Sequence, residues 1–221
     1  MSMTQNISSQ RKRSNPPPKK KSTGPNKTLF IAIVIIIIGI VGISAGMWIM
    51  NTLSSQDEGD AIAVIDTSKG VIKIDLYEDI VPETCENFIK LANDGFYDGM
   101  IFHRVQDDFM IQVGNTYPDG STEQSPYGNI AFESNDTISH VDGAISMAST
   151  GAGLGGSSQF FICDGAQSSL DGSYAVFGET IEGIDVVRDI ADEPHDNSYG
   201  SVGGGRPNID IIINSIIIEY E

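Results

Sequence analysis

Short apolar runs separated by polar, glycine-containing turns make up most of the chain after residue 60. Residues 62–67 and 71–76 are two such runs, rich in Ile and Val, and they flank the turn sequence Ser68-Lys69-Gly70. Two β-prone runs joined by a short turn with glycine are typical of a hairpin. The sequence therefore predicts that this region opens with a β-hairpin.

Two segments with helical features interrupt the apolar runs. The first begins at Pro82, runs to about Asp94 and is followed by Gly95. Proline in the first turn and glycine just past the end are usual helix signals. The second predicted helix covers residues 184–191.

The other apolar runs are short and predict strands. They are residues 101–105, 109–113, 143–147, 160–163, 175–177 and 209–220. Many short strands with only two helices predict a mainly β fold, in which a sheet closes into a barrel and the helices cap it.

Residues 29–50 form an unbroken, uncharged run rich in Ile. As a helix with about 1.5 Å per residue, this run spans roughly 33 Å, enough to cross the hydrocarbon core of a bilayer. It is longer than the roughly 7–15 apolar residues of a secretory signal peptide. We interpret it as an uncleaved single-pass transmembrane helix, with a cleaved signal peptide as the alternative.

The chain is expected to have four parts. They are a basic, disordered cytoplasmic tail (1–28), the transmembrane helix (29–50), a polar linker (51–60) and one folded domain (61–221). Seven of the 13 Lys and Arg residues fall within residues 1–27, where no acidic residue occurs. Because basic flanks stay in the cytoplasm, the folded domain is expected outside it, at the cell membrane.

The rest of the chain is strongly acidic. It holds six basic residues against 30 acidic ones, a net charge of −24. Nucleic-acid binding needs clustered Lys and Arg, so this composition argues against a nucleic-acid partner. Cys85 and Cys163 follow no metal-ligand spacing, and we expect no metal site. Two buried free thiols are favoured, while a disulfide stays possible if the domain lies outside the cytosol.

Arg104 stands close to the apolar run Phe109-Met110-Ile111, separated from it by a short polar turn. Arginine keeps its charge at any ordinary pH, and its planar fork offers five N–H donors. An arginine beside an apolar wall is suited to grip a carbonyl or amide of a ligand whose apolar part fills the wall. This combination indicates a peptide ligand, and a proline peptide in particular.

Three segments carry the candidate chemistry. In chain order they are Phe102-His103-Arg104 with Phe109-Met110-Ile111-Gln112; Ser146-Met147-Ala148-Ser149 with Ser158-Gln159-Phe160-Phe161-Ile162-Cys163; and Leu170-Asp171-Gly172-Ser173-Tyr174-Ala175-Val176-Phe177-Gly178. Their order and spacing closely resemble the cyclophilin family of peptidyl-prolyl cis-trans isomerases. The resemblance covers essentially all of residues 61–221.

The resemblance implies a closed, eight-stranded antiparallel barrel capped by two α-helices, and an enzyme without a cofactor. It implies that Arg104 is the catalytic residue. The residues implied to bind substrate are Phe109, Met110, Phe161 and Leu170 in a proline pocket, Gln112 supporting the arginine, Ala148, Ser149 and Gln159 along the peptide groove, and Tyr174 where many members have histidine. His103 is interpreted as scaffold rather than as a general base.

We therefore expect a membrane-anchored, monomeric peptidyl-prolyl isomerase whose domain lies outside the cytoplasm. Its expected partners are proline-containing peptides and unfolded exported or membrane proteins. The alternative is a membrane-tethered peptide-binding or chaperone module whose turnover is incidental.

Overall fold

The structure, a computed structural model, describes residues 59–200 and 203–221. The chain divides after Gln56, and the unit Asp57–Glu221 contains every described residue. The expected tail, the expected transmembrane helix and nearly all of the expected linker lie outside the described residues. Within the described ranges, every helix is too short or too polar to cross a membrane.

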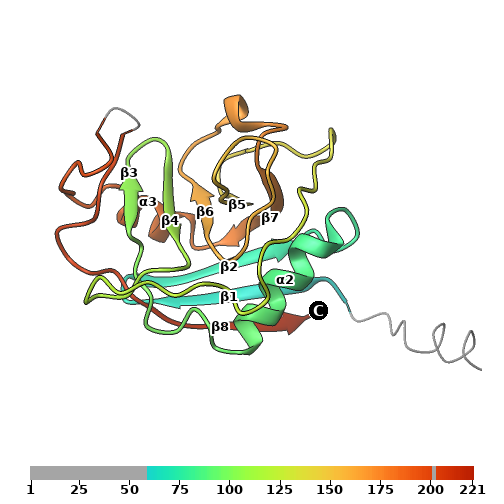
Figure 1. Cartoon of the computed structure of the whole chain (residues 1–221), viewed down its shortest axis with the longest axis horizontal. Coiled ribbons are helices and arrows are strands. Elements are labelled where there is room, and N and C mark those ends of the chain that lie inside the picture. Colours follow the sequence, from blue (N-terminus) through green and yellow to red (C-terminus); the bar gives the residue numbers. More distant parts are fainter. Residues whose placement is uncertain (1–58, 201–202) are drawn as a thin grey trace, which may run out of the picture. The chain divides into compact units, whose positions relative to one another are not determined.

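Eight strands of the described part form one antiparallel sheet, in the order β3-β4-β6-β5-β7-β2-β1-β8 (Figure 1). The predicted hairpin is confirmed, with Thr67 opposite Gly70 at its turn. The strands are β1 (Ala61–Thr67), β2 (Gly70–Leu76), β3 (Arg104–Gln106), β4 (Met110–Val113), β5 (Ala144–Met147), β6 (Phe160–Cys163), β7 (Ala175–Glu182) and β8 (Ile213–Tyr220).

Both predicted helices are confirmed, as α2 (Pro82–Asn93) and α3 (Ile184–Ala191). Pro82 occupies the first turn of α2, and Gly95 just beyond its end has a φ of 67°, which favours glycine. The helix α2 packs against β7 and β8, whereas α3 packs against β2, β3 and β4. The 3-10 turn η1 (Ser168–Leu170) was not predicted.

The sheet is a half-barrel, so the prediction of a closed barrel was wrong. In the described residues, its end strands β3 and β8 form no ladder with each other. The predicted strand 101–105 is divided, because Ile101 forms an isolated bridge with Ile212 while β3 pairs with β4. The outer edge of β3 is occupied by Gly205, whose N–H and C=O both bond to Val105. A loop therefore takes the place that β8 would need to close the barrel.

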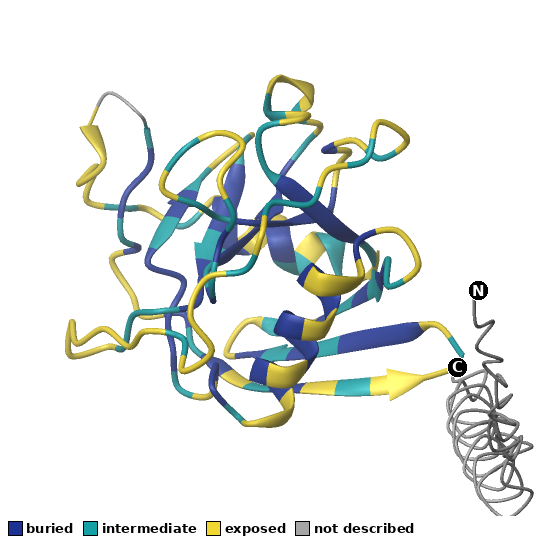
Figure 2. Ribbon diagram, turned by 45° about the vertical axis from the view of Figure 1, so that its right-hand side comes forward, coloured by how far each residue is buried: buried dark blue, intermediate teal, exposed yellow. Residues whose placement is uncertain are grey.

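The main core lies between the sheet and α2. Phe88 of α2 is at its centre, with ring centroids 5.6 Å from Tyr97, 5.3 Å from Phe160 and 5.2 Å from Phe177. All four rings are fully buried. Figure 2 shows buried residues along the strands and on one face of α2, and exposed residues mainly in the loops, on the other face of α2 and at the end of β8. This aromatic group holds α2 on the half-barrel.

Both cysteines are free and buried, as favoured from the sequence. Cys85 lies in α2 and Cys163 ends β6. Burial raises the pKa of each thiol to about 12, and nearby carboxylates act in the same direction. The thiols are therefore protonated at neutral pH and poorly reactive.

Phe88→Ala is expected to lower the free energy of unfolding by about 3–5 kcal/mol, because it leaves a cavity among buried aromatic rings. Urea denaturation of a fragment covering residues 57–221 measures the loss. Glu86→Ala, at an exposed position of the same helix, is the control and should change the free energy by less than about 0.5 kcal/mol. A loss below about 1 kcal/mol for Phe88→Ala would contradict its central place in the core.

Candidate active site

Neighbouring residues of β4 and β6 serve two different apolar clusters, because side chains along a strand point alternately to opposite faces. Ile111 and Phe160 belong to the main core, whereas Met110 and Phe161 belong to a second, smaller cluster. The buried members of this second cluster are Met110, Ala144, Phe161, Cys163 and Val176. The second cluster therefore lies on the face of these strands that turns away from the core.

A pocket of about 220 Å³ opens at the second cluster. It is lined by Arg104, Phe109, Met110, Gln112, Ala148, Ser149, Phe161, Leu170, Tyr174 and Tyr199. All but one of the predicted site residues are thus brought together. The exception, Gln159, lines an adjoining pocket of about 310 Å³, which shares Gln112, Ala148 and Ser149 with the first.

Arg104 begins β3 and is partly buried at the pocket. Its Nε and Nη2 both donate to the carbonyl oxygen of Gly203, at 3.2 and 3.0 Å. Its guanidinium carbon lies 5.8 Å from the ring centroid of Phe109 and 5.0 Å from that of Tyr199. Burial lowers the pKa of Arg104, while Tyr199 and Tyr174 act in the opposite direction. The side chain remains a cation at neutral pH.

Gln112 lies directly opposite Arg104 in the pairing of β3 with β4. Its side-chain amide donates to Oε1 of Gln159 at 2.9 Å. This bond orients the Gln112 amide where the two pockets meet. The backbone of a peptide bound across both pockets would therefore pass this amide.

The wall formed by Phe161 is supported from behind by His140, which the sequence did not single out. The two rings are stacked, with centroids 5.9 Å apart and planes 6° from parallel. His140 Nδ1 lies 2.8 Å from Oδ1 of Asp171, and its Nε2 lies 3.1 Å from Oγ of Ser146. Tyr174 meets Phe161 edge-on at 5.8 Å. The orientation of the wall is therefore fixed by buried polar contacts as well as by packing.

Phe109 is positioned by the turn that precedes it. Asp108 has a φ of 54°, which is uncommon for a residue other than glycine. Its N–H donates to Oδ2 of Asp164 at 3.0 Å, and its carbonyl accepts from the Gln167 amide at 2.9 Å. The N–H of Asp164 in turn donates to the Phe109 carbonyl at 3.0 Å. Asp164 and Gln167, which follow β6, thus hold this turn in place by hydrogen bonds.

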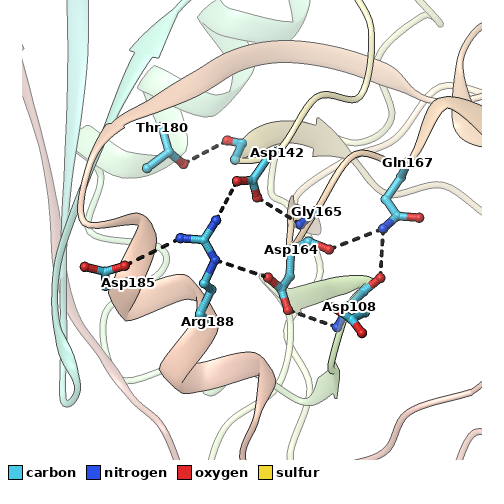
Figure 3. A network of polar contacts seen from close by, with 9 residues as sticks. Asp108, Asp142, Asp164, Gly165, Gln167, Thr180, Asp185 and Arg188 are labelled. Carbon is cyan, nitrogen blue, oxygen red and sulfur yellow. Dashed lines mark hydrogen bonds and ion pairs between the residues drawn. The ribbon is translucent and has the colours of Figure 1, made fainter.

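Arg188 of α3 connects this hydrogen-bonded turn to the rest of the domain (Figure 3). Its Nη2 lies 2.6 Å from Oδ2 of Asp142, and its Nε lies 4.0 Å from Oδ1 of Asp164. Burial raises the pKa of Asp164, whereas the N–H of Asp108 and the charge of Arg188 lower it. Nη1 of Arg188 also lies 3.5 Å from Oδ1 of Asp185 in the same helix, so one cation faces three carboxylates near the turn that carries Phe109.

His103 is packed as scaffold beside Arg104. Its side chain is buried, and its Nδ1 has no hydrogen-bond partner among the described residues. Burial and the charge of Arg104 lower the pKa of His103 to about 4, so the ring is neutral at pH 7 and a poor general base there. In residues 59–200 and 203–221, no group of three or more His, Cys, Asp or Glu is placed to hold a metal ion.

Tyr199 lines the pocket of about 220 Å³ but was not predicted from the sequence. It belongs to a turn-rich segment between α3 and β8, with no spacing motif that would have indicated the pocket. Its contact with Arg104 arises only from the way this segment folds back onto β3.

The chain is similar to known proteins of one family. Residues 62–217 match the family described as cyclophilin type peptidyl-prolyl cis-trans isomerase/CLD. A peptidyl-prolyl cis-trans isomerase of Synechococcus elongatus is 44% identical over 130 residues, which cover 58% of this chain and 87% of the relative. The peptidyl-prolyl cis-trans isomerase-like 3 of Gallus gallus is 37% identical over 155 residues, covering 69% of this chain and 92% of the relative.

The fold has a solved counterpart as well. A crystal structure of a cyclophilin type peptidyl-prolyl cis-trans isomerase from Cryptosporidium parvum, in the presence of the dipeptide Ala-Pro, gives a TM-score of 0.64 at 31% sequence identity. The match covers 72% of this chain and 99% of that chain.

His103→Gln is expected to flatten the dependence of stability on pH between about 4 and 6.5. In the folded domain the pKa of His103 is about 4, against an ordinary value of 6.5. Between these values the unfolded chain binds more protons, so the contribution of neutral His103 is present above pH 6.5 and is lost as the pH falls toward 4.

Urea midpoints measured across this pH range test the expectation. His195→Gln, which changes a less buried ring in the segment between α3 and β8, is the matched control. Identical pH profiles for His103→Gln and the unchanged chain would contradict it.

Proposed function

The chain belongs to the family of cyclophilin-type peptidyl-prolyl cis-trans isomerases, and on this basis we propose that Arg104 carries the catalytic step of rotation about X–Pro bonds. Its relatives are named peptidyl-prolyl cis-trans isomerases, and the chain is an enzyme of this class. It binds proline-containing peptides, in keeping with the Ala-Pro dipeptide used with the Cryptosporidium relative.

The chemistry needs neither a covalent intermediate nor a base. Amide resonance sets a barrier of about 18–20 kcal/mol to rotation, and this resonance is lost in the twisted state. A cation that donates a hydrogen bond to the proline nitrogen stabilises that state, because the nitrogen lone pair becomes available only when resonance is broken. The interaction is stronger in the transition state than in the ground state, which is the condition for catalysis.

The observation that carries the proposal is that Arg104 and an apolar surface line the same small pocket. Phe109, Met110, Phe161 and Leu170 supply the apolar surface. The volume, about 220 Å³, is below the roughly 300–1,000 Å³ of pockets that enclose drug-sized ligands. It suits a proline ring with part of its neighbouring peptide. The ring is held while the preceding carbonyl rotates.

The adjoining pocket gives the flanking peptide a place to bind. Gln112 and Gln159 meet at its border, and Ala148 and Ser149 line both pockets. We assign these residues to the peptide groove. Tyr174, edge-on to Phe161, completes the wall of the proline pocket.

Arg104→Ala is expected to lower kcat/KM on a short proline peptide by on the order of 10²–10³-fold, the usual effect of losing one preorganised donor. Exchange between the cis and trans peptide, followed by NMR or by a coupled spectroscopic assay, measures the change. Lys69→Ala removes a surface cation that pairs with Glu193 and is the matched control. An unchanged rate with retained peptide binding would instead favour a binding or chaperone module.

We further propose that residues 29–50 anchor the chain in a membrane and that the domain acts outside the cytoplasm, as a monomer, on exported or membrane proteins. The support is in the sequence, where an uncharged run of sufficient length follows seven basic residues. The folding clients are then proteins that cross or enter the same membrane.

A site-specific protease added to intact cells is expected to cut the protein at a cleavage sequence inserted in residues 51–60, because this linker is proposed to lie outside the cytoplasm. The same sequence inserted in residues 1–28 is the control and should be cut only after lysis. Immunoblotting of the two fragments reads the result. Protection of the linker site in intact cells would contradict the proposed orientation.

A further inference from the structure

We propose that Tyr199 is a positioning residue for Arg104, held over the guanidinium by a loop that contains three consecutive glycines. The inference rests on the proposed role of Arg104. The loop is described in two limbs, residues 195–199 and 203–207, which we call the outgoing and the returning limb.

The two limbs are bonded to each other, so Tyr199 has a defined place. The N–H of Asp196 donates to the carbonyl of Arg206 at 3.0 Å, and Oδ1 of Asp196 accepts the N–H of Arg206 at 2.9 Å. The same carboxylate oxygen accepts the N–H of Ser198 at 2.9 Å. The N–H of Tyr199 donates to the carbonyl of Gly204 at 3.3 Å. The outgoing limb is therefore fixed along most of its length.

The returning limb is built to lie against β3. Gly205 exchanges two backbone hydrogen bonds with Val105, at 2.9 and 3.1 Å. Gly203 and Gly204 have φ values of 82° and 76°, which disfavour any residue with a side chain. A Cβ at Gly203 would collide with the side chain of Gln106, and one at Gly204 would lie 2.5 Å from the carbonyl oxygen of Val105. At Gly204, where the obstacle is backbone, only glycine permits this close approach.

Because the returning limb lies so close to β3, the loop restrains Arg104 in two independent ways. The carbonyl of Gly203 accepts from both Nε and Nη2, which restrains the guanidinium edge. The Tyr199 ring, with its centroid 5.0 Å from the guanidinium carbon, restrains its face by a cation–π contact. Tyr199 also lines the pocket, although 39% of its surface stays exposed. Arg104 is thereby oriented before a substrate binds, which is the condition for preorganised stabilisation.

A tyrosine that merely covers the surface would affect stability but not the chemical step. A positioning residue lowers kcat more than it raises KM, and it acts only when the residue that it positions is present. These two signatures separate the roles.

Tyr199→Ala in the full-length chain, held in detergent micelles, is expected to lower kcat about five- to tenfold while KM changes less than about twofold. Tyr199→Phe retains the ring and should stay within about twofold of the unchanged chain. Tyr127→Ala is the matched control, because Tyr127 also covers a cation, Lys90, with its centroid 3.6 Å from Nζ. An unchanged kcat for Tyr199→Ala would overturn the inference.

The double variant gives the decisive comparison. In the Arg104→Ala background, Tyr199→Ala should cause no further loss, because there is no guanidinium left to position. Equal losses in both backgrounds would overturn the positioning role. If Arg104→Ala alone leaves the rate unchanged, the proposed role of Arg104 is overturned and this inference with it. If only Arg104→Ala lowers the rate, this inference alone fails.

Gly204→Ala tests the other restraint. A Cβ at Gly204 would lie 2.5 Å from the backbone carbonyl oxygen of Val105, so the returning limb would have to move away from β3 together with the adjoining Gly203 carbonyl that Arg104 bonds. We therefore expect kcat to fall several-fold. Gly120→Ala is the matched control, since Gly120 has a φ of 84° and open space around its Cβ position. It introduces the same backbone strain away from the pocket. Equal kcat values for the two glycine variants would overturn the role of the loop.

Discussion

The alternation of side chains along β4 and β6 is the constraint on which both the core and the pocket depend. Phe160 and Phe161 are neighbours in sequence but face opposite sides of the sheet, the first against Phe88 and the second over His140. A register shift of one residue would exchange the two faces along a whole strand. Because the core fixes the pairing of Ile111 with Ile162, it also fixes which residues reach the pocket. The active-site geometry is thus inherited from the packing of the core.

Local sequence signals were sufficient for elements that begin and end at proline or glycine. The helix α2 begins at Pro82 and closes before Gly95, so its ends are encoded within the segment itself. Strand β7 continues five residues past the apolar run that predicted it, because it stays paired with β2 as far as Glu182 while the N–H of Thr180 donates to the carbonyl of Gly143. Closure of the barrel was mispredicted for a related reason. The docking of Gly205 on β3 is a tertiary event with no local hydrophobic pattern.

The residues of the candidate site also divide into those that the sequence could predict and those that it could not. Arg104, Gln112 and Phe161 lie in segments whose order and spacing resemble a known family, so their convergence on one pocket could be predicted. Tyr199 and His140 come from segments without such spacing, and only the folded chain shows their contacts with Arg104 and Phe161. The role of each residue in turnover stays a prediction.

The pairing of β1 with β8 has a consequence for the synthesis of the protein. β1 is the first strand of the domain to leave the ribosome, yet one of its two neighbours, β8, is the last. The helix α2 also packs against β8, so its apolar face lacks part of its cover until that strand emerges. Native contacts between distant parts of a chain form late. The nascent domain therefore keeps apolar surface exposed through most of translation, when other factors have access to it.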